Sequence, residues 1–139
     1  MSALAMAGTA SSRNKLMRID HMGLYPEVRR GDYVIWQEVR GFVQEGLYVV
    51  ANGDFQNVYQ VQNCGGKLAL LWPDRDIDPK TRERKPGIEP LEYSLEDFAK
   101  FCLGFVVATV KVQHEGAFLG GETLKGRNAR APKRSLVAA

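Results

Sequence analysis

Short apolar segments separated by turn-forming residues dominate the middle of the chain. Residues 33–39 are rich in β-branched and aromatic side chains, and residues 46–51 carry Leu, Tyr and Val. Asn52-Gly53 follows at once, and this dipeptide is among the stronger signals for a two-residue β-hairpin. In residues 55–62, apolar side chains mix with amides, as on a half-buried strand. The pattern therefore predicts a β-hairpin at Asn52-Gly53.

Two further segments extend this β pattern. Gly65-Gly66 turns the chain into an apolar run over 67–72, so three antiparallel strands should follow one another in order. Residues 105–112 are the most β-prone run of all. Their near-continuous apolarity predicts a strand buried on both faces, within the core and against something else, such as another subunit.

A short helix and a long loop interrupt the strands. Ser94 is followed three positions later by Asp97, which resembles a capping box and predicts a helix to about Phe101, stopped by Gly104. Residues 73–90 are dominated by Asp, Lys, Arg and Pro without periodicity, which predicts a long surface loop.

Three acidic residues alternate in that loop, at Asp74, Asp76 and Asp78. They lack the Gly and the distal Glu of an EF-hand, so we interpret them as a solvated acidic turn and not as a Ca²⁺ site. His21 and His114 have no other ligand at metal-binding spacing. We expect no metal and no cofactor.

With 139 residues, the chain has the length of one domain. Residues 1–15 show no periodicity and are typical of a disordered arm or linker remnant. Residues 16–113 should form a mostly β domain with one short helix, and residues 114–139 a basic, flexible tail. The aromatic residues could form a stacking platform for nucleic acid, but core and interface packing explains them better. They include Trp36, Tyr48, Tyr59 and Trp72.

The net charge of +3 is mild, and its excess lies after Glu122. The cations there are Lys125, Arg127, Arg130, Lys133 and Arg134. This basic tail could contact phosphates, although a solvated terminus is the commoner role of such a segment. We therefore expect DNA contact to be indirect or weak.

The cysteines and the apolar runs indicate the compartment. Cys64 and Cys102 form no CxxC motif and no paired framework, so reduced thiols in a cytoplasm are expected. The N-terminus lacks the basic residue and apolar length of a signal peptide. The longest apolar runs are too short to span a bilayer. We predict a cytoplasmic protein that does not enter a membrane.

One segment near the N-terminus carries a recognisable motif. It reads Gly23-Leu24-Tyr25-Pro26-Glu27-Val28-Arg29-Arg30-Gly31-Asp32, followed by the β-rich run from Tyr33. This resembles the signature of the LexA, UmuD and phage-repressor peptidase family, in which a Ser-Met-x-Pro turn precedes a spacer, Gly-Asp and a strand. Pro26, Gly31 and Asp32 match that pattern, and Leu24 stands where the family has Met. The resemblance extends over residues 16–113 and implies twisted, partly closed β-sheets of the LexA and signal-peptidase type.

The same resemblance predicts that the Ser–Lys dyad of the family is lost. The nucleophilic Ser maps onto Gly23, which has no side chain, and the Lys base maps onto Tyr59. An activated nucleophile needs a base within hydrogen-bond reach, and an ordinary Tyr is protonated near neutral pH. His21 could act as a base, but no Ser, Thr or Cys lies beside it. We therefore predict that the chain has no catalytic residues and is not an enzyme.

The resemblance implies a function in assembly. In the family this domain self-associates, while a separate helix-turn-helix domain binds operator DNA; no such domain is visible in this sequence. We expect a homo-oligomer that pairs through the apolar strand. The candidate interface residues are Phe105, Val106, Val107, Val110 and Val112. Two alternatives stay open: a stand-alone, antirepressor-like regulator that binds a full-length repressor, and a residual or altered serine peptidase.

Overall fold

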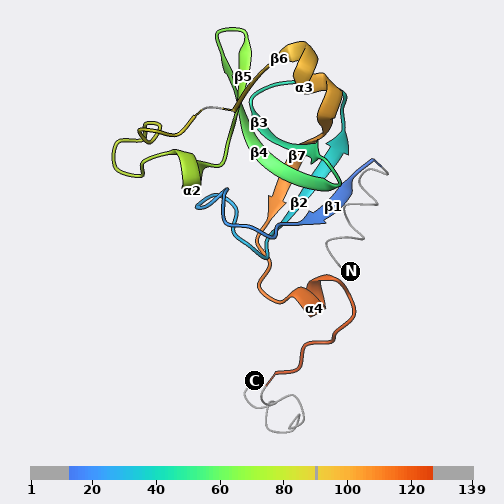
Figure 1. Ribbon diagram of the computed structural model, residues 1–139. Helices are drawn as coiled ribbons and strands as arrows, with labels where there is room; N and C mark the ends of the chain where they lie inside the picture. The colour runs from blue at the N-terminus through green and yellow to red at the C-terminus, as the bar shows by residue number, and fades with distance from the viewer. Residues whose placement is uncertain (1–12, 90, 127–139) are drawn as a thin grey trace, which may run out of the picture.

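The protein is built on one antiparallel sheet of seven strands in the order β1-β2-β7-β3-β4-β5-β6 (Figure 1). The structure is a computed structural model and describes residues 13–89 and 91–126. The strands are β1 (Lys15–Arg18), β2 (Tyr33–Glu38), β3 (Gly46–Asn52), β4 (Phe55–Cys64), β5 (Lys67–Leu71), β6 (Leu91–Ser94) and β7 (Cys102–Val110). The sheet is not closed, with β1 and β6 at its two edges. The prediction of a mostly β fold is confirmed.

Within the described residues, three short helices accompany the sheet where the sequence predicted one: α2 (Pro73–Asp76), α3 (Leu95–Phe101) and α4 (Glu115–Phe118). The predicted helix is α3, and the side chain of Ser94 accepts a hydrogen bond from the Asp97 N–H, as a capping residue does. The helix ends at Phe101, because Cys102 already has an extended backbone. Gly104, which we expected to stop the helix, lies inside β7.

The predicted hairpin is formed by β3 and β4, which pair from Gly46 opposite Val61 to Asn52 opposite Phe55. The turn lies one residue later than predicted, because Asn52 still pairs in the ladder and Gly53 adopts a positive φ of 67°. The strand β5 then pairs antiparallel with β4. The succession of three antiparallel strands is confirmed. The two edge strands, β1 and β6, were not predicted.

The strand β7 lies in the interior of the sheet. It pairs with β2 from Tyr33 opposite Val110 to Glu38 opposite Gly104. On its other side it pairs with β3 only from Cys102 to Phe105, and the ladder with β3 ends there. Residues 107–109 are exposed, so burial on both faces holds only for the first part of this strand.

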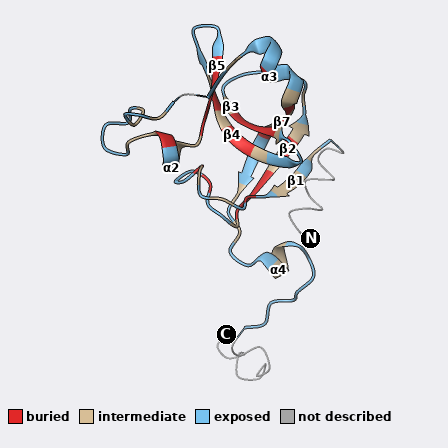
Figure 2. Cartoon of the chain, in the orientation of Figure 1, coloured by how far each residue is buried: buried red, intermediate tan, exposed pale blue. Residues whose placement is uncertain are grey.

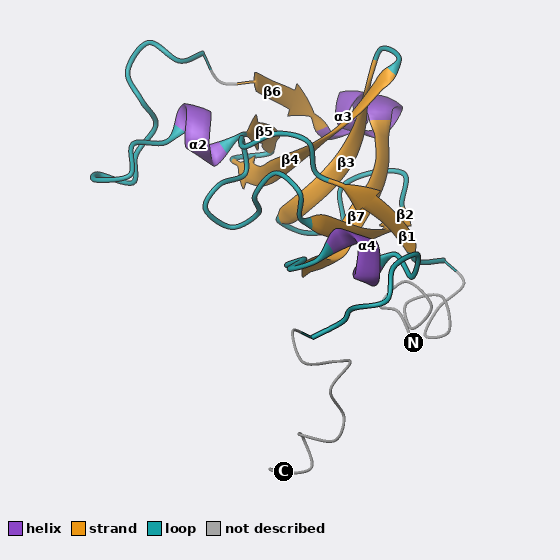
Figure 3. Cartoon of the chain, turned by 90° about the horizontal axis from the view of Figure 1, so that it is seen from below, coloured by secondary structure: helices purple, strands orange, loops and turns teal. Residues whose placement is uncertain are grey.

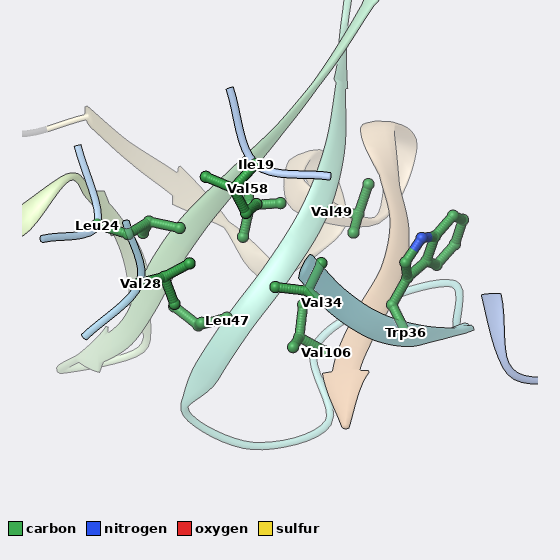
Figure 4. Packing of buried hydrophobic residues seen from close by; sticks show 9 residues of the cluster. All are labelled: Ile19, Leu24, Val28, Val34, Trp36, Leu47, Val49, Val58 and Val106. Carbon is green, nitrogen blue, oxygen red and sulfur yellow. The ribbon is translucent and has the colours of Figure 1, made fainter. Parts of the chain in front are cut away.

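Apolar side chains fill both faces of the curled sheet. One cluster joins the segment before β2 to the central strands (Figure 4). It consists of Ile19, Leu24, Val28, Val34, Trp36, Leu47, Val49, Val58 and Val106. The second cluster lies under α3, whose Phe98 is fully buried against Tyr48 with ring centroids 5.3 Å apart. Burial is therefore concentrated in the central strands (Figure 2).

The ordered body extends beyond the boundaries that we expected. Lys15, placed in the N-terminal arm, begins β1. Glu115 in α4, placed in the flexible tail, accepts hydrogen bonds from the Tyr33 hydroxyl at 2.6 Å and from Arg18 Nε at 2.8 Å. The ring of Phe118 lies 5.1 Å from that of Tyr33. The chain after β7 thus returns to β1 and β2 before it leaves the body (Figure 3).

Candidate functional site

Positions 23 and 59, which the motif resemblance aligns with a Ser–Lys dyad, meet at one side chain, the indole of Trp72. The ring of Tyr59 stacks on it at a centroid distance of 4.9 Å and an interplanar angle of 11°. On Gly23, an added Cβ atom would lie 2.7 Å from Trp72 Cγ. The imidazole of His21 lies 4.7 Å from the indole, and the Arg75 guanidinium lies 5.0 Å from it. We call this group the Trp72 cluster: His21, Gly23, Tyr59, Trp72 and Arg75.

The indole is held in place by the hairpin and by α2. Trp72 Nε1 donates a hydrogen bond of 2.8 Å to the Val58 carbonyl on β4. The backbone N–H of Trp72 donates to the carboxylate of Asp76, at the end of α2. The N–H of Asp74 donates to the Gly23 carbonyl at 3.0 Å. The loop that we predicted on the surface therefore begins with a helical turn that is fastened to the motif segment.

Burial shifts the pKa values of two groups in the cluster, the His21 imidazole and the Tyr59 phenol. Desolvation lowers the pKa of His21, so its imidazole is neutral at physiological pH. Its Nδ1 accepts a hydrogen bond of 3.1 Å from the Gly23 N–H, which leaves the proton on Nε2. This Nε2 is buried without a hydrogen-bond partner among the described residues. Desolvation also raises the pKa of the Tyr59 phenol.

The chemistry open to the cluster follows from these groups. None of the five residues carries an aliphatic hydroxyl or a thiol, the usual protein nucleophiles in acyl transfer. A phenol with a raised pKa stays protonated near neutral pH and is a poor base. The volume that a serine side chain would need at position 23 is filled by the indole. The rings of the cluster pack on one another, and two of its polar side-chain atoms, His21 Nδ1 and Trp72 Nε1, bind backbone groups.

The remaining motif residues tie the segment before β2 to β7. Leu24 is buried in the first core cluster, and the Tyr25–Pro26 peptide bond is cis. Gly31 has a positive φ of 95°, which favours glycine. The carboxylate of Asp32 accepts hydrogen bonds from the Arg29 N–H at 2.9 Å and from Lys111 Nζ at 2.8 Å.

Burial of Asp32 opposes its ionisation, but these hydrogen bonds outweigh burial and lower its pKa. Lys111 Nζ also donates to the Glu27 carbonyl at 2.6 Å. Lys111 directly follows β7, so one ammonium group links the end of that strand to both sides of the motif turn. The Gly-Asp pair therefore has a structural explanation in this chain.

The candidate interface residues do not share one environment. Val106 belongs to the first core cluster, and the Phe105 ring packs 5.0 Å from the ring of Tyr48. Val110 and Val112 are half-buried. Val107, at 47% exposure, is the one exposed member of the five. Val106 is therefore a core residue, and Phe105 is partly buried beside the second core cluster, while both also line a groove next to the free edge of β7.

Other candidate groups are placed as follows. Asp76 is buried and not solvated, and hydrogen bonds from Arg75 and from the Trp72 N–H outweigh desolvation and lower its pKa. The described residues hold no group of three or more potential metal ligands. Cys64 is exposed and Cys102 is buried, and both are free thiols. Of the basic tail only Lys125 is described, while Arg127, Arg130, Lys133 and Arg134 lie outside the described residues.

Sequence reasoning missed the role of Trp72. It expected the aromatic residues to pack, without connecting this one to positions 23 and 59. The available signal was Trp72-Pro73, a large ring at the end of an apolar strand and directly before a proline that can begin a helical turn. The residues that fasten α4, Arg18 and Tyr33, carried no such signal, because Glu115 is 97 residues from Arg18.

The described part of the chain contains no helix with the length and apolar character needed to cross a bilayer. Neither the protein-family models nor the curated proteins include a match to this chain. The resemblance to the LexA and phage-repressor family therefore rests on the motif residues and on their order along the chain.

Proposed function

We propose that this chain is a non-cleaving, self-associating regulatory domain of a LexA-type or phage-type transcriptional repressor. Its pairing would hold two DNA-binding domains together, so that they occupy paired half-sites cooperatively. The observation that carries the proposal is the Trp72 cluster, in which packed rings occupy the two positions of the dyad. A domain of this type without a nucleophile retains binding as its means of control.

The surface proposed for pairing is the free part of β7. The strand β3 pairs with β7 only as far as Phe105, so one backbone edge of Val107, Ala108 and Thr109 lacks a ladder partner in the described sheet. A shallow groove of about 540 Å³ lies between this edge and the start of β3, and Glu27, Gln44 and Glu45 form part of its lining. Free N–H and C=O groups on a strand edge favour addition of another strand.

Two copies would pair these edges antiparallel about a two-fold axis, so that the same surface serves both subunits. The pairing of β7 with β2 is irregular at Val107. Ala108 lies opposite Ile35 and Val106 lies opposite Trp36, so Val107 between them has no partner on β2. Its exposed side chain would lie near the centre of the contact. A stable interface needs roughly 800 Å² from each partner, so neighbouring surface must contribute as well.

Sedimentation equilibrium of the full chain and of Val107→Asp tests this proposal. We expect the wild type to form dimers or larger assemblies, and Val107→Asp to weaken association about 30-fold or more, because it buries an unpaired carboxylate. Leu95→Asp is the matched control, since Leu95 has a similar exposure of 50% but lies on α3. A wild type that stays monomeric up to about 1 mM, or equal weakening by both variants, would contradict the proposal.

A further inference from the structure

The loop after α2 contains a small β-finger that projects from the body, which we define as residues 76–85 (Figures 1 and 3). Ile77 and Arg84 form an antiparallel bridge. The Asp78 N–H donates to the Glu83 carbonyl, and the Lys85 N–H donates to the Asp76 carbonyl, both at 2.8 Å. These bonds close a short hairpin that is held by one isolated bridge.

The tip of the finger is organised by Asp78. Its carboxylate accepts a hydrogen bond of 2.8 Å from the Lys80 N–H, and its carbonyl accepts one of 2.8 Å from the Arg82 N–H. Arg82 has a positive φ of 63°, which is uncommon for a residue other than glycine. At the base, Asp76 is buried and bonded to the Trp72 N–H. The finger therefore presents a defined backbone, which limits the entropy lost when its side chains bind a partner.

The finger carries four cations, Lys80, Arg82, Arg84 and Lys85, against three acids, Asp76, Asp78 and Glu83. Lys80 and Arg82 are exposed and Lys85 is half-buried, and none of them forms an ion pair with another described residue. Arg84 at the base has a buried Nη1 without a hydrogen-bond partner among the described residues. Burial raises the pKa of Asp76, and the hydrogen bonds from Arg75 and from the Trp72 N–H lower it. The charge of Arg84 adds a smaller lowering effect. Of the three acids, Asp76 is paired with Arg75 and Asp78 accepts a backbone N–H at the tip, while Glu83 is exposed and forms no ion pair with another described residue.

We propose that this β-finger binds the phosphate backbone of duplex DNA. Phosphates bind exposed cations, and Lys80 and Arg82 are exposed without an ion pair to another described residue. The finger projects from the sheet, so a duplex can reach its tip without displacing the body (Figure 1). This goes beyond self-association, because it assigns direct DNA contact to the domain itself and to a surface other than the basic tail.

Fluorescence anisotropy with a labelled 24-base-pair duplex, titrated between about 50 and 200 mM salt, tests the proposal. Neutralising Lys80, Arg82 and Lys85 together to Ala should reduce the slope of log Kd against log salt by about 2.7, or about 0.9 for each phosphate contact. Affinity at about 50 mM salt should fall at least about tenfold. The charge-conserving variant Lys80→Arg, Arg82→Lys, Lys85→Arg should retain the wild-type slope and Kd.

Two controls separate the finger from net charge and from the tail. Neutralising Arg40, Lys67 and Lys100 changes the net charge equally outside the finger and should leave the slope near the wild-type value. A variant with Ala at 127, 130, 133 and 134 should keep the finger-dependent part of the slope. The proposal is overturned if the wild type does not bind DNA at low salt, or if the finger variant and the Arg40, Lys67 and Lys100 variant change the slope equally. It is also overturned if only the tail variant loses binding, or if poly-glutamate competes as well as DNA. All of these variants keep Val107 and the free edge of β7, so a difference between the finger and control triples is assigned to the finger and not to self-association.

Discussion

Placing at position 23 the serine that the LexA and phage-repressor motif carries there should destabilise the protein and should not produce self-cleavage. In Gly23→Ser the new Cβ would lie 2.7 Å from Trp72 Cγ and 2.8 Å from Cδ2, closer than real Cβ contacts. The indole cannot move freely, because it stacks on Tyr59 and donates to the Val58 carbonyl. The collision must therefore be relieved by displacing a packed ring or the motif segment.

The cost of this substitution can be estimated from its parts. Overpacking of a well-packed site costs about 1–3 kcal/mol, and loss of the indole hydrogen bond about 1 kcal/mol more. Replacing glycine returns about 0.4–1 kcal/mol by restricting the unfolded chain, since no positive φ is required at position 23. We expect the free energy of unfolding to fall by about 2 kcal/mol.

Urea denaturation followed by tryptophan fluorescence measures this change. Gly121→Ser is the matched control, because a Cβ at Gly121 meets no atom within 4 Å and its φ is not in the left-handed region. Its free energy of unfolding should change by less than about 0.5 kcal/mol. In a Trp72→Ala background the Gly23→Ser substitution should also cost less than about 0.5 kcal/mol, as a double-mutant cycle requires for coupled residues. Equal effects of Gly23→Ser in both backgrounds would refute the reasoning.

Three further substitutions test other parts of the structure. Asp32→Asn should lower the free energy of unfolding at pH 7 by about 1–2 kcal/mol. Because the folded pKa of Asp32 lies below its unfolded value of about 3.9, this contribution is present above that pH and is lost as pH falls through the folded pKa. The free energy of unfolding of the variant should therefore fall less steeply with decreasing pH below about pH 4 than that of the wild type. An equally steep fall in both proteins would contradict the role given to Asp32. Tyr33→Phe removes the bond to Glu115 and should speed tryptic cleavage after Lys111 while the urea midpoint changes little; equal cleavage rates would contradict the anchoring of α4. Gly104→Ala should lower the free energy of unfolding by about 3 kcal/mol or more, because its Cβ would collide with the Trp36 ring and lie 2.6 Å from the Gln37 carbonyl oxygen. An unchanged free energy in urea denaturation would show that β2 and β7 can move apart to accept the methyl group.

Local signals in the sequence predicted local structure well. The hairpin of β3 and β4 and the cap of α3 at Ser94 depend on residues within a few positions of one another. The edge strands β1 and β6 have only four residues each, and their position depends on pairing with distant partners. The position of β7 could not be predicted for the same reason. Its apolar run is equally compatible with an interior strand and with an interface, and only the pairing with β2 and β3 decides between them.

The site was predicted in part. The motif resemblance identified positions 23 and 59 as the place to look, and the structure brings both to Trp72. It could not predict what fills the space, because Trp72 reaches position 23 through the fold and not through sequence spacing. The acidic alternation was misread for a similar reason: Asp76 is buried by the return of the chain to the motif segment, and Asp78 organises a tip that composition alone describes as loop.

The Trp72 cluster also explains why positions 23 and 59 must be considered together. A side chain at position 23 collides with the indole, and a lysine at position 59 would lose the stacked ring that holds the indole in place. Each position is therefore coupled to the other through Trp72, although they belong to different elements. Installing serine and lysine together would still leave the indole between them, with its Nε1 bonded to the Val58 carbonyl. A functional dyad on this scaffold would need a third change that replaces the indole, while the backbone N–H of residue 72 would still bind Asp76 at the base of the β-finger.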